Sequence, residues 1–157
     1  SEEWNILVLI YGMLALGMVM EFSGGSRMIA SSVSQITAGG LDGPTQVILT
    51  LVVLYLITSI LTELLSNAAT IVIMAPISLE IASQIGLTAV DARAFLLTTC
   101  IAASASFITP IGYQTNTFVY SVGGYKFTDF AKIGIFLNLI YFTGTIALVC
   151  FYWDFTL

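Results

Sequence analysis

The sequence predicts an all-α integral membrane protein. Of its 157 residues, 58% are hydrophobic and only 8% are charged, whereas soluble domains average about 25% charged residues. Four Lys/Arg and nine Asp/Glu are too few to cover a soluble surface around so much apolar side chain, and several apolar runs are long enough to cross a bilayer as helices. We expect transmembrane helices combined with an in-plane amphipathic helix, a re-entrant helical hairpin and a broken, unwound helix.

The composition argues against several classes of function. A net charge of −5 without any Lys/Arg cluster argues against a nucleic-acid partner, because phosphate binding needs clustered cations. The chain has no His, so it cannot form a Ser-His-Asp triad or a His-ligated metal site, and the motif Gly-x-Ser-x-Gly is absent. We therefore expect no enzymatic activity. Cys100 and Cys150 lie far apart in apolar segments and are interpreted as small apolar fillers.

Residues 1–43 predict a scaffold-type unit with one spanning helix and one in-plane helix. The first helix runs from Trp4 to Phe22, carries no charge before Glu21 and has Trp4 where an interfacial aromatic belongs. Residues 23–25 interrupt it. Residues 26–37 then predict an amphipathic helix in the interface plane. Its predicted apolar face consists of Met28, Ile29, Val33 and Ile36.

Residues 44–86 predict a re-entrant hairpin, the first part of a transport-type region over residues 44–157. Two helical arms, 46–65 and 69–85, are each long enough to span a bilayer at about 1.5 Å per residue, so length alone leaves two full spans open. The connection between them is small and apolar instead of charged, which favours a tip at membrane depth, held by protein or by a wet cavity.

Glu63 is the one acid close to this tip. An intramembrane acid is a functional hypothesis by default. A direct role in ion coupling, an Arg or Lys partner elsewhere, and exposure to water at the tip all stay open.

Residues 90–122 predict a broken helix. An apolar helix over 95–107 runs into the polar stretch 109–116, where Pro110 and Gly112 should interrupt it, and apolar character returns at Phe118. Residues 123–129 form an aqueous loop in which Thr128 can cap the terminal helix, predicted over 130–153.

The two interruptions predict a binding site for ions. Helix starts expose N–H groups that attract an anion, helix ends expose carbonyls that attract a cation, and discontinuous helices that meet near the bilayer midplane are typical of secondary transporters. Purely structural roles for these residues, without ion binding, stay open. Ser66 and Asn67 can cap a helix, polar residues near Pro110 such as Asn116 can satisfy freed backbone groups, and the small residues 104–106 can serve close helix packing.

These motifs resemble the divalent anion:sodium symporter family of the ion transporter superfamily. The resemblance rests on Thr-Glu-Leu-Leu-Ser-Asn-Ala at 62–68 and Pro-Ile-Gly-Tyr-Gln-Thr-Asn at 110–116, in the order of that family's C-terminal half. It implies a sodium site formed by Thr62, Ser66, Asn67 and the backbone of Gly112. It also implies an anion site that touches Ser66, Asn67, Thr115 and Asn116.

Two departures from the family pattern bear on the substrate. Ala68 stands where the signature has Thr, and residues 113–115 replace the commoner Thr-Pro-Pro. We therefore expect a compact oxyanion such as sulfate in preference to a dicarboxylate.

The resemblance implies sodium-coupled symport of a divalent anion in a multi-pass protein of the cell (inner) membrane. It also implies a homodimer, and an N-terminal half of the same polypeptide, missing here, that completes the second sodium site and the pocket. Two alternatives stay open: an antiporter or exporter of the same superfamily with Glu63 as proton carrier, and a non-transporting membrane module derived from a permease.

Overall fold

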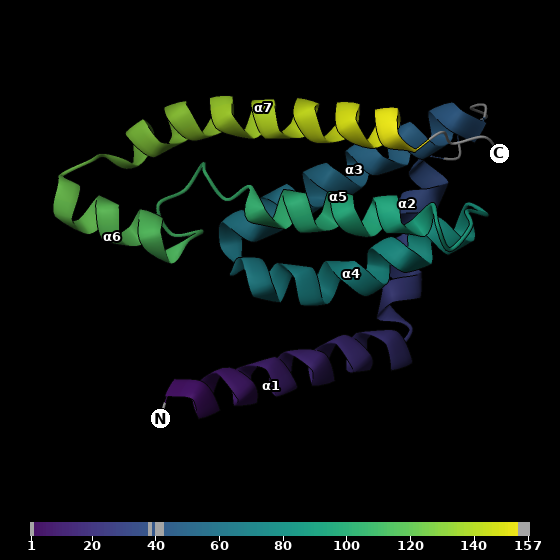
Figure 1. Ribbon diagram of the computed structural model, residues 1–157, viewed down its shortest axis with the longest axis horizontal. Coiled ribbons are helices and arrows are strands. Elements are labelled where there is room, and N and C mark those ends of the chain that lie inside the picture. The colour runs from purple at the N-terminus through teal and green to yellow at the C-terminus, as the bar shows by residue number, and fades with distance from the viewer. Residues whose placement is uncertain (1, 38, 40–42, 154–157) are drawn as a thin grey trace.

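The computed structural model describes residues 2–37, 39 and 43–153, and these residues form seven helices and no strand (Figure 1). The all-α prediction is therefore confirmed. Two helices, α3 and α7, are long and apolar enough to cross a membrane. The helices are α1 (Glu2–Phe22), α2 (Gly25–Thr37), α3 (Gly43–Leu64), α4 (Asn67–Gln84), α5 (Ala92–Ser104), α6 (Gln114–Gly123) and α7 (Phe127–Tyr152).

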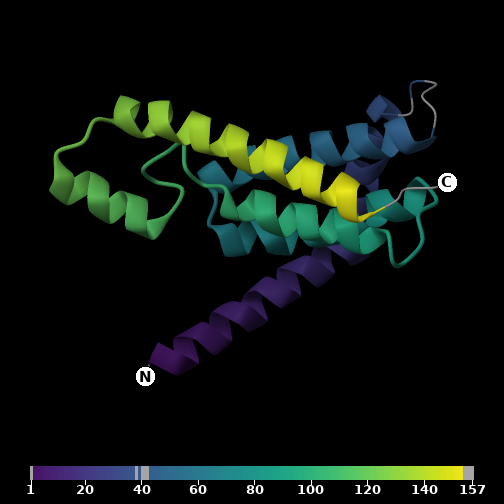
Figure 2. The ribbon, with the colours of Figure 1, turned by 45° about the horizontal axis from the view of Figure 1, so that its top comes forward.

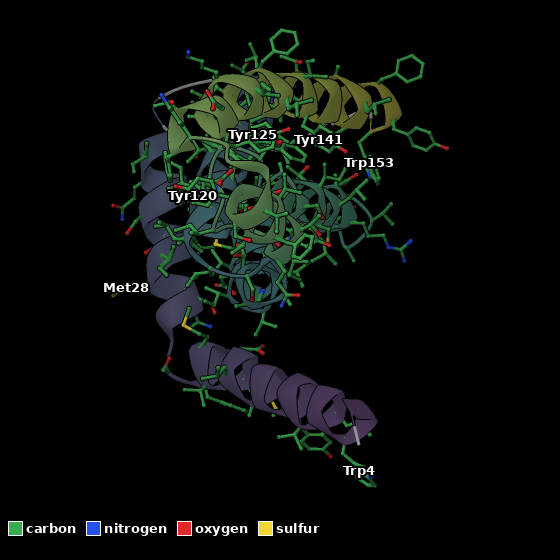
Figure 3. All side chains as sticks on the ribbon, turned by 90° about the vertical axis from the view of Figure 1, so that its left-hand side faces the viewer. Trp4, Met28, Tyr120, Tyr125, Tyr141 and Trp153 are labelled. Atoms are coloured by element: carbon green, nitrogen blue, oxygen red, sulfur yellow. The ribbon has the colours of Figure 1, made fainter. Side chains whose placement is uncertain are left out.

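The turn between α1 and α2 lies where the sequence predicted an interruption. Gly24 adopts φ +75°, a left-handed conformation that glycine reaches without strain. α1 then packs against α4, where Gly17 faces Val72 at ordinary contact distance. Its N-terminal end leads away from the other helices (Figure 2), and Figure 3 shows Trp4 far from Trp153. That α1 spans the bilayer stays a prediction.

The buried face of α2 differs from the predicted apolar face. Met28 and Ile36 are each 72% exposed, whereas Val33, which the prediction grouped with them, is buried. Small side chains let α2 approach its neighbours closely, which explains why the packed face is not the most apolar one. The buried stripe consists of Ser26, Ala30, Val33 and Thr37.

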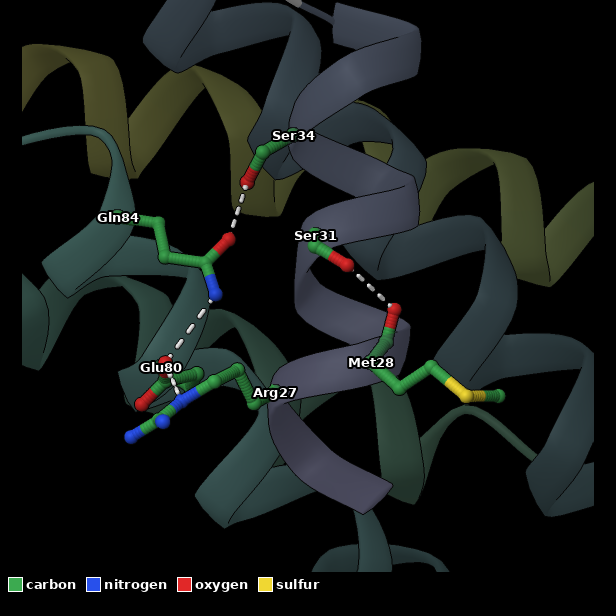
Figure 4. A network of polar contacts seen from close by, with 6 residues as sticks. All are labelled: Arg27, Met28, Ser31, Ser34, Glu80 and Gln84. Atoms are coloured by element: carbon green, nitrogen blue, oxygen red, sulfur yellow. Dashed lines mark hydrogen bonds and ion pairs between the residues drawn. The ribbon is translucent and has the colours of Figure 1, made fainter. Parts of the chain in front are cut away.

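Polar contacts on the flank of α2 attach it to α4 (Figure 4). Arg27 Nε lies 3.5 Å from Glu80 Oε1, and Ser34 Oγ donates to Gln84 Oε1 at 3.2 Å. Gln84 Nε2 in turn donates to Glu80 Oε1 at 3.1 Å. Glu80, the second acid of the apolar run 44–86 after Glu63, is therefore paired with Arg27 at the surface.

The predicted helical hairpin is formed by α3 and α4, which are joined by Leu65 and Ser66. α5 packs against both arms and lies between them in Figure 1. Buried apolar side chains from all three helices, such as Leu51, Ile77 and Phe95, form one core. Insertion of α5 brings its C-terminal end to the hairpin tip. That this tip lies at membrane depth stays a prediction.

α5 ends earlier than the sequence predicted. The expected helix ran to Phe107, but α5 stops at Ser104, and α6 begins at Gln114. We call residues 105–113 the linking segment. In this segment, side-chain amides donate the hydrogen bonds that backbone amides donate within a helix. Asn138 donates to the Ala105 carbonyl and Asn116 to the Ser106 carbonyl. α6 has no buried residue in the described structure and extends beyond the ends of the other helices (Figures 1 and 2).

α7 begins three residues earlier than predicted, and Thr128 is not its cap. Its N-cap residue is Lys126, whose backbone N–H donates to Asp129 Oδ2 at 2.9 Å. A carboxylate in the first turn also suits the positive end of the helix dipole. At the other end, Trp153 Nε1 donates to the Val90 carbonyl at 3.3 Å, so the end of α7 lies beside the start of α5.

Candidate functional site

The end of α3 meets α5 and the linking segment at Thr62. Thr62 is fully buried, and its hydroxyl oxygen lies 2.5 Å from the Ala103 carbonyl oxygen and 2.9 Å from Asn67 Oδ1. Its own carbonyl accepts a hydrogen bond from Ser106 Oγ at 3.2 Å. Thr62 therefore joins the hairpin tip, the last turn of α5 and the linking segment.

Glu63 holds two backbone amides of the linking segment. Its Oε1 accepts the Ile108 N–H at 2.9 Å and its Oε2 accepts the Thr109 N–H at 2.8 Å. The Thr109 hydroxyl also donates to the Glu63 carbonyl at 3.2 Å, and Glu63 is only 7% exposed. Within the described chain, the partners of this acid are thus backbone amides and not Arg or Lys.

Ser66 and Asn67 mark the start of α4. Ser66 is the N-cap, and its exposed side chain accepts the Ala69 N–H at 3.2 Å. This is the helix-capping role that the sequence left open for Ser66 as an alternative to ion binding. Asn67, the first helical residue, is half-buried and turns its side-chain oxygen to Thr62. The hairpin tip therefore contributes one exposed hydroxyl and one half-buried amide.

Gly112 lies buried against the end of α3. Its N–H donates to Thr109 Oγ1 at 3.1 Å. A Cβ at this position would overlap the Ser106 hydroxyl oxygen and lie 3.2 Å from Glu63 Oε2. Only glycine lets the backbone approach this closely.

The two predicted residues on α6 differ in their contacts. Asn116 Nδ2 donates to the carbonyls of Ser106 and Thr109 at 3.0 and 3.3 Å, so it satisfies backbone groups of the linking segment. Thr115 is exposed, and the described hydrogen bonds do not connect it to the hairpin tip. The structure thus brings Thr62, Asn67 and Gly112 to one contact region, and none of its described hydrogen bonds joins Thr115 to that region.

α7 contributes a residue that the sequence reasoning missed. Asn138 is 9% exposed, accepts the Ser59 hydroxyl at 3.1 Å and donates to the Ala105 carbonyl at 3.0 Å. The sequence did contain a signal for Asn138. It is the single side-chain amide in the apolar stretch 130–153, and polar groups at membrane depth need partners.

A cavity lies between α6 and α7 beside the linking segment. Its volume is about 600 Å³, and it is lined mainly by apolar and aromatic side chains, with Asn116, Asp129 and Lys132 among the polar ones. Phe107 and Gly134 also line it. Asn116 therefore faces both the linking segment and an open space.

The oxygen atoms around Thr62 have the chemistry of a site for a hard cation. The hydroxyl of Thr62 donates to the Ala103 carbonyl oxygen, and the side-chain amide of Asn67 lies 2.9 Å from the same hydroxyl. Neutral hydroxyl, amide and carbonyl oxygens that converge in this way suit a small hard cation. The described residues contain no group of three or more His, Cys, Asp or Glu that could hold a metal ion.

Comparisons with known proteins show the family to which the chain belongs. The whole chain, residues 1–157, matches the family described as the sodium:sulfate symporter transmembrane region. It is 44% identical over 147 residues to an uncharacterized transporter of Synechocystis sp., covering 94% of this chain and 23% of that protein.

Two eukaryotic relatives carry more specific names. The chain is 34% identical over 133 residues to a probable sodium/sulfate cotransporter of Chlamydomonas reinhardtii, covering 83% of this chain and 14% of that protein. It is 33% identical over 138 residues to solute carrier family 13 member 2 of Mus musculus, covering 87% of this chain and 22% of that protein. The chain thus spans about a quarter of the length of these relatives, or less.

Proposed function

We propose that this chain takes part in sodium-coupled transport of a divalent anion, with sulfate preferred, since it belongs to the sodium:sulfate symporter transmembrane family. Members of this family are transporters, and the apolar helices agree with an integral membrane protein. The contact between the two helix interruptions at Thr62 carries the proposal, because it gathers polar groups from α3, α4 and α5 in a largely apolar chain.

The proposed sodium site consists of Thr62, Ser66, Asn67 and the backbone of Gly112. The converging oxygens of Thr62, Asn67 and Ala103 support it. Sodium could bind the lone pairs of these neutral oxygens. Gly112 supports the site through its close approach to the end of α3.

The proposed anion site touches Ser66, Asn67, Thr115 and Asn116. The first pair lies at the start of α4 and the second in the first turn of α6. Free N–H groups and the positive dipole end at a helix start favour an anion. Hydroxyl and amide groups can bind an oxyanion without a fixed charge, so that the ion can leave again.

The remaining parts of the transporter are also proposed here. Residues 1–43 serve as scaffold and residues 44–157 as the transport region, with the hairpin 44–86 re-entrant and α5 and α6 in one broken crossing. The N-terminal half of the same polypeptide completes the pocket, and two copies form a homodimer in the cell (inner) membrane. The Glu63 contacts with Ile108 and Thr109 support a structural role for this acid over that of a proton carrier.

Uptake into liposomes tests the proposal. Full-length protein is reconstituted, and radiolabelled sulfate or succinate is offered with and without an inward sodium gradient. We expect sodium-dependent sulfate uptake that exceeds succinate uptake. Equal uptake without sodium would contradict the coupling, and preference for succinate would contradict the substrate assignment.

Two variants and a matched control test the site. Asn67→Ala should abolish uptake, and Thr62→Val should raise the half-saturating sodium concentration by about tenfold, as expected for the loss of about 1.4 kcal/mol of binding free energy. Thr143→Val is the control, because the exposed Thr143 hydroxyl bonds to carbonyls of its own helix. Parental transport by both site variants would refute the assignment.

A further inference from the structure

The linking segment is held from two sides. On one side, Glu63 of α3 accepts the N–H groups of Ile108 and Thr109. On the other side, Asn138 of α7 donates to the Ala105 carbonyl. The α7 contact lies at residue 105 and the α3 contacts lie at residues 108 and 109, so the backbone between them cannot shift without breaking one of these hydrogen bonds.

Gly134 brings α7 into direct contact with the same five residues. A Cβ at Gly134 would overlap the Phe107 carbonyl oxygen and lie 2.6 Å from Ile108 Cα, which is closer than carbon atoms approach without displacement. Gly134 and Asn138 are four residues apart and therefore share one face of α7. Tyr141 extends this face, since its ring meets that of Phe107 edge-on at 5.0 Å.

Asn138 also joins this face to α3. Its Oδ1 accepts the Ser59 hydroxyl, and Ser59 lies one helical turn before Glu63. Ala105 is the first residue beyond α5, so its carbonyl lacks a helical partner and needs another donor. Asn138 thus fixes both the end of α5 and its distance from α3.

We infer that α7, through Asn138 and Gly134, positions the linking segment and thereby sets the affinity for sodium, although neither residue belongs to the proposed ion sites. Ala103 and Gly112, whose backbone atoms lie at or near the proposed sodium site, flank residues 105–109 on either side. A displaced segment therefore moves these backbone atoms relative to Thr62. The effect on sodium affinity rests on the proposed function, whereas the positioning of the linking segment by α7 does not.

The test compares Gly134→Ala with Gly144→Ala in the full-length protein. Both glycines lie on α7, but a Cβ at Gly144 meets no atom within 4 Å in the described structure. Asn138→Asp is the second variant, since an ionised Asp keeps the size and the acceptor for Ser59 but cannot donate to Ala105. Hydrogen–deuterium exchange is measured on the peptide with Ile108 and Thr109, and sulfate uptake is measured against sodium concentration.

We expect Gly134→Ala and Asn138→Asp to speed exchange at Ile108 and Thr109 and to raise the half-saturating sodium concentration, each by about tenfold, on the scale of one hydrogen bond. The maximal uptake rate per folded molecule should change far less.

Wild-type exchange and sodium dependence in both variants would overturn the inference, and so would an equal effect of Gly144→Ala. Faster exchange with an unchanged sodium requirement would overturn the link to affinity. If wild-type uptake proves independent of sodium, the proposed function fails, while the exchange rates alone still decide whether α7 positions the segment.

Discussion

The carboxylate of Glu63 replaces helical hydrogen bonds that the linking segment gives up. Two backbone N–H groups of a non-helical segment must find acceptors when water is excluded. Glu63 supplies both acceptor oxygens at 2.9 and 2.8 Å, so neither amide is left buried without a partner. A single side chain therefore lets the chain leave the helical conformation at the hairpin tip.

Replacing this carboxylate should destabilise the protein. Glu63→Gln keeps one acceptor oxygen but turns an NH₂ group toward an N–H donor, so we expect the free energy of unfolding to fall by about 1 to 3 kcal/mol and the Tm in detergent to be lower. Glu80→Gln is the control, because Glu80 forms a partly exposed pair with Arg27 and should cost about 1 kcal/mol or less. Equal Tm values for the two variants would argue against the structural role of Glu63.

The close contact between Gly112 and Ser106 predicts that a substitution at Ser106 can rescue a substitution at Gly112. Gly112→Ala places a methyl group against the Ser106 hydroxyl oxygen, and overpacking of this kind typically costs about 1 to 3 kcal/mol. Ser106→Ala removes the overlapping atom, so the double variant should recover part of the stability and uptake that Gly112→Ala loses. A double-mutant cycle in which the two effects simply add would show that the residues do not contact each other.

Residues of the site differ in how far the sequence specified them. Thr62 and Asn67 were named from a motif, and the structure places them in one hydrogen bond. Their roles in ion binding stay predictions. Ser106 was interpreted as a packing residue, but it donates to Thr62, and Asn138 was not considered at all. Both bind backbone carbonyls from distant segments, and such long-range partners leave no local sequence pattern.

At the scale of elements, helix ends were less predictable than helices. The sequence specified every helix from apolar runs interrupted by Gly, Pro and polar residues, but it extended α5 to Phe107. Propensity favours a helix through residues 104–107, and tertiary hydrogen bonds from Asn138 and Asn116 ended it at Ser104 instead. In α2, the sequence indicated an apolar face for a helix in the interface plane, whereas the face that packs against the neighbouring helices carries small side chains.

The packed face of α2 can be tested by a pair of substitutions. Ala30 is fully buried, whereas Ile36 is 72% exposed. Ala30→Leu should therefore lower the free energy of unfolding by about 1 to 3 kcal/mol through overpacking, while Ile36→Ala should change it by about 0.5 kcal/mol or less, as at other surface positions. Thermal unfolding in detergent measures both. A larger loss for Ile36→Ala would show that α2 packs through the face of Ile36 and not through that of Ala30.

At the scale of the whole molecule, the order of elements was predictable and their contacts were not. The sequence arranged a hairpin and a broken helix in series, but nothing local indicated that α5 would lie between α3 and α4. This insertion brings the two interruptions together. It also explains why α7, although last in the chain, contacts the linking segment directly. Nonlocal packing of this kind depends on the shapes of all helices at once.

The lengths of the helices predict how α5 and α6 cross the membrane. At about 1.5 Å per residue, α5 with 13 residues and α6 with 10 residues are each too short for a hydrocarbon core of about 30 Å. α7 with 26 residues is long enough. Trp153, just after α7, bonds to Val90 just before α5. We therefore predict that α5, the linking segment and α6 together form one crossing, antiparallel to α7.

Cysteine labelling tests this topology. In a background of Cys100→Ala and Cys150→Ala, single cysteines replace the exposed residues Ala89 and Lys126, and a membrane-impermeant maleimide is applied to sealed vesicles before and after permeabilisation. One crossing between these positions requires that one cysteine reacts in sealed vesicles and that the other reacts only after permeabilisation. Reaction of both from the same side would mean that α5 and α6 enter and leave by one face. That result would contradict both the antiparallel arrangement with α7 and a shared site of the two interruptions near the membrane midplane.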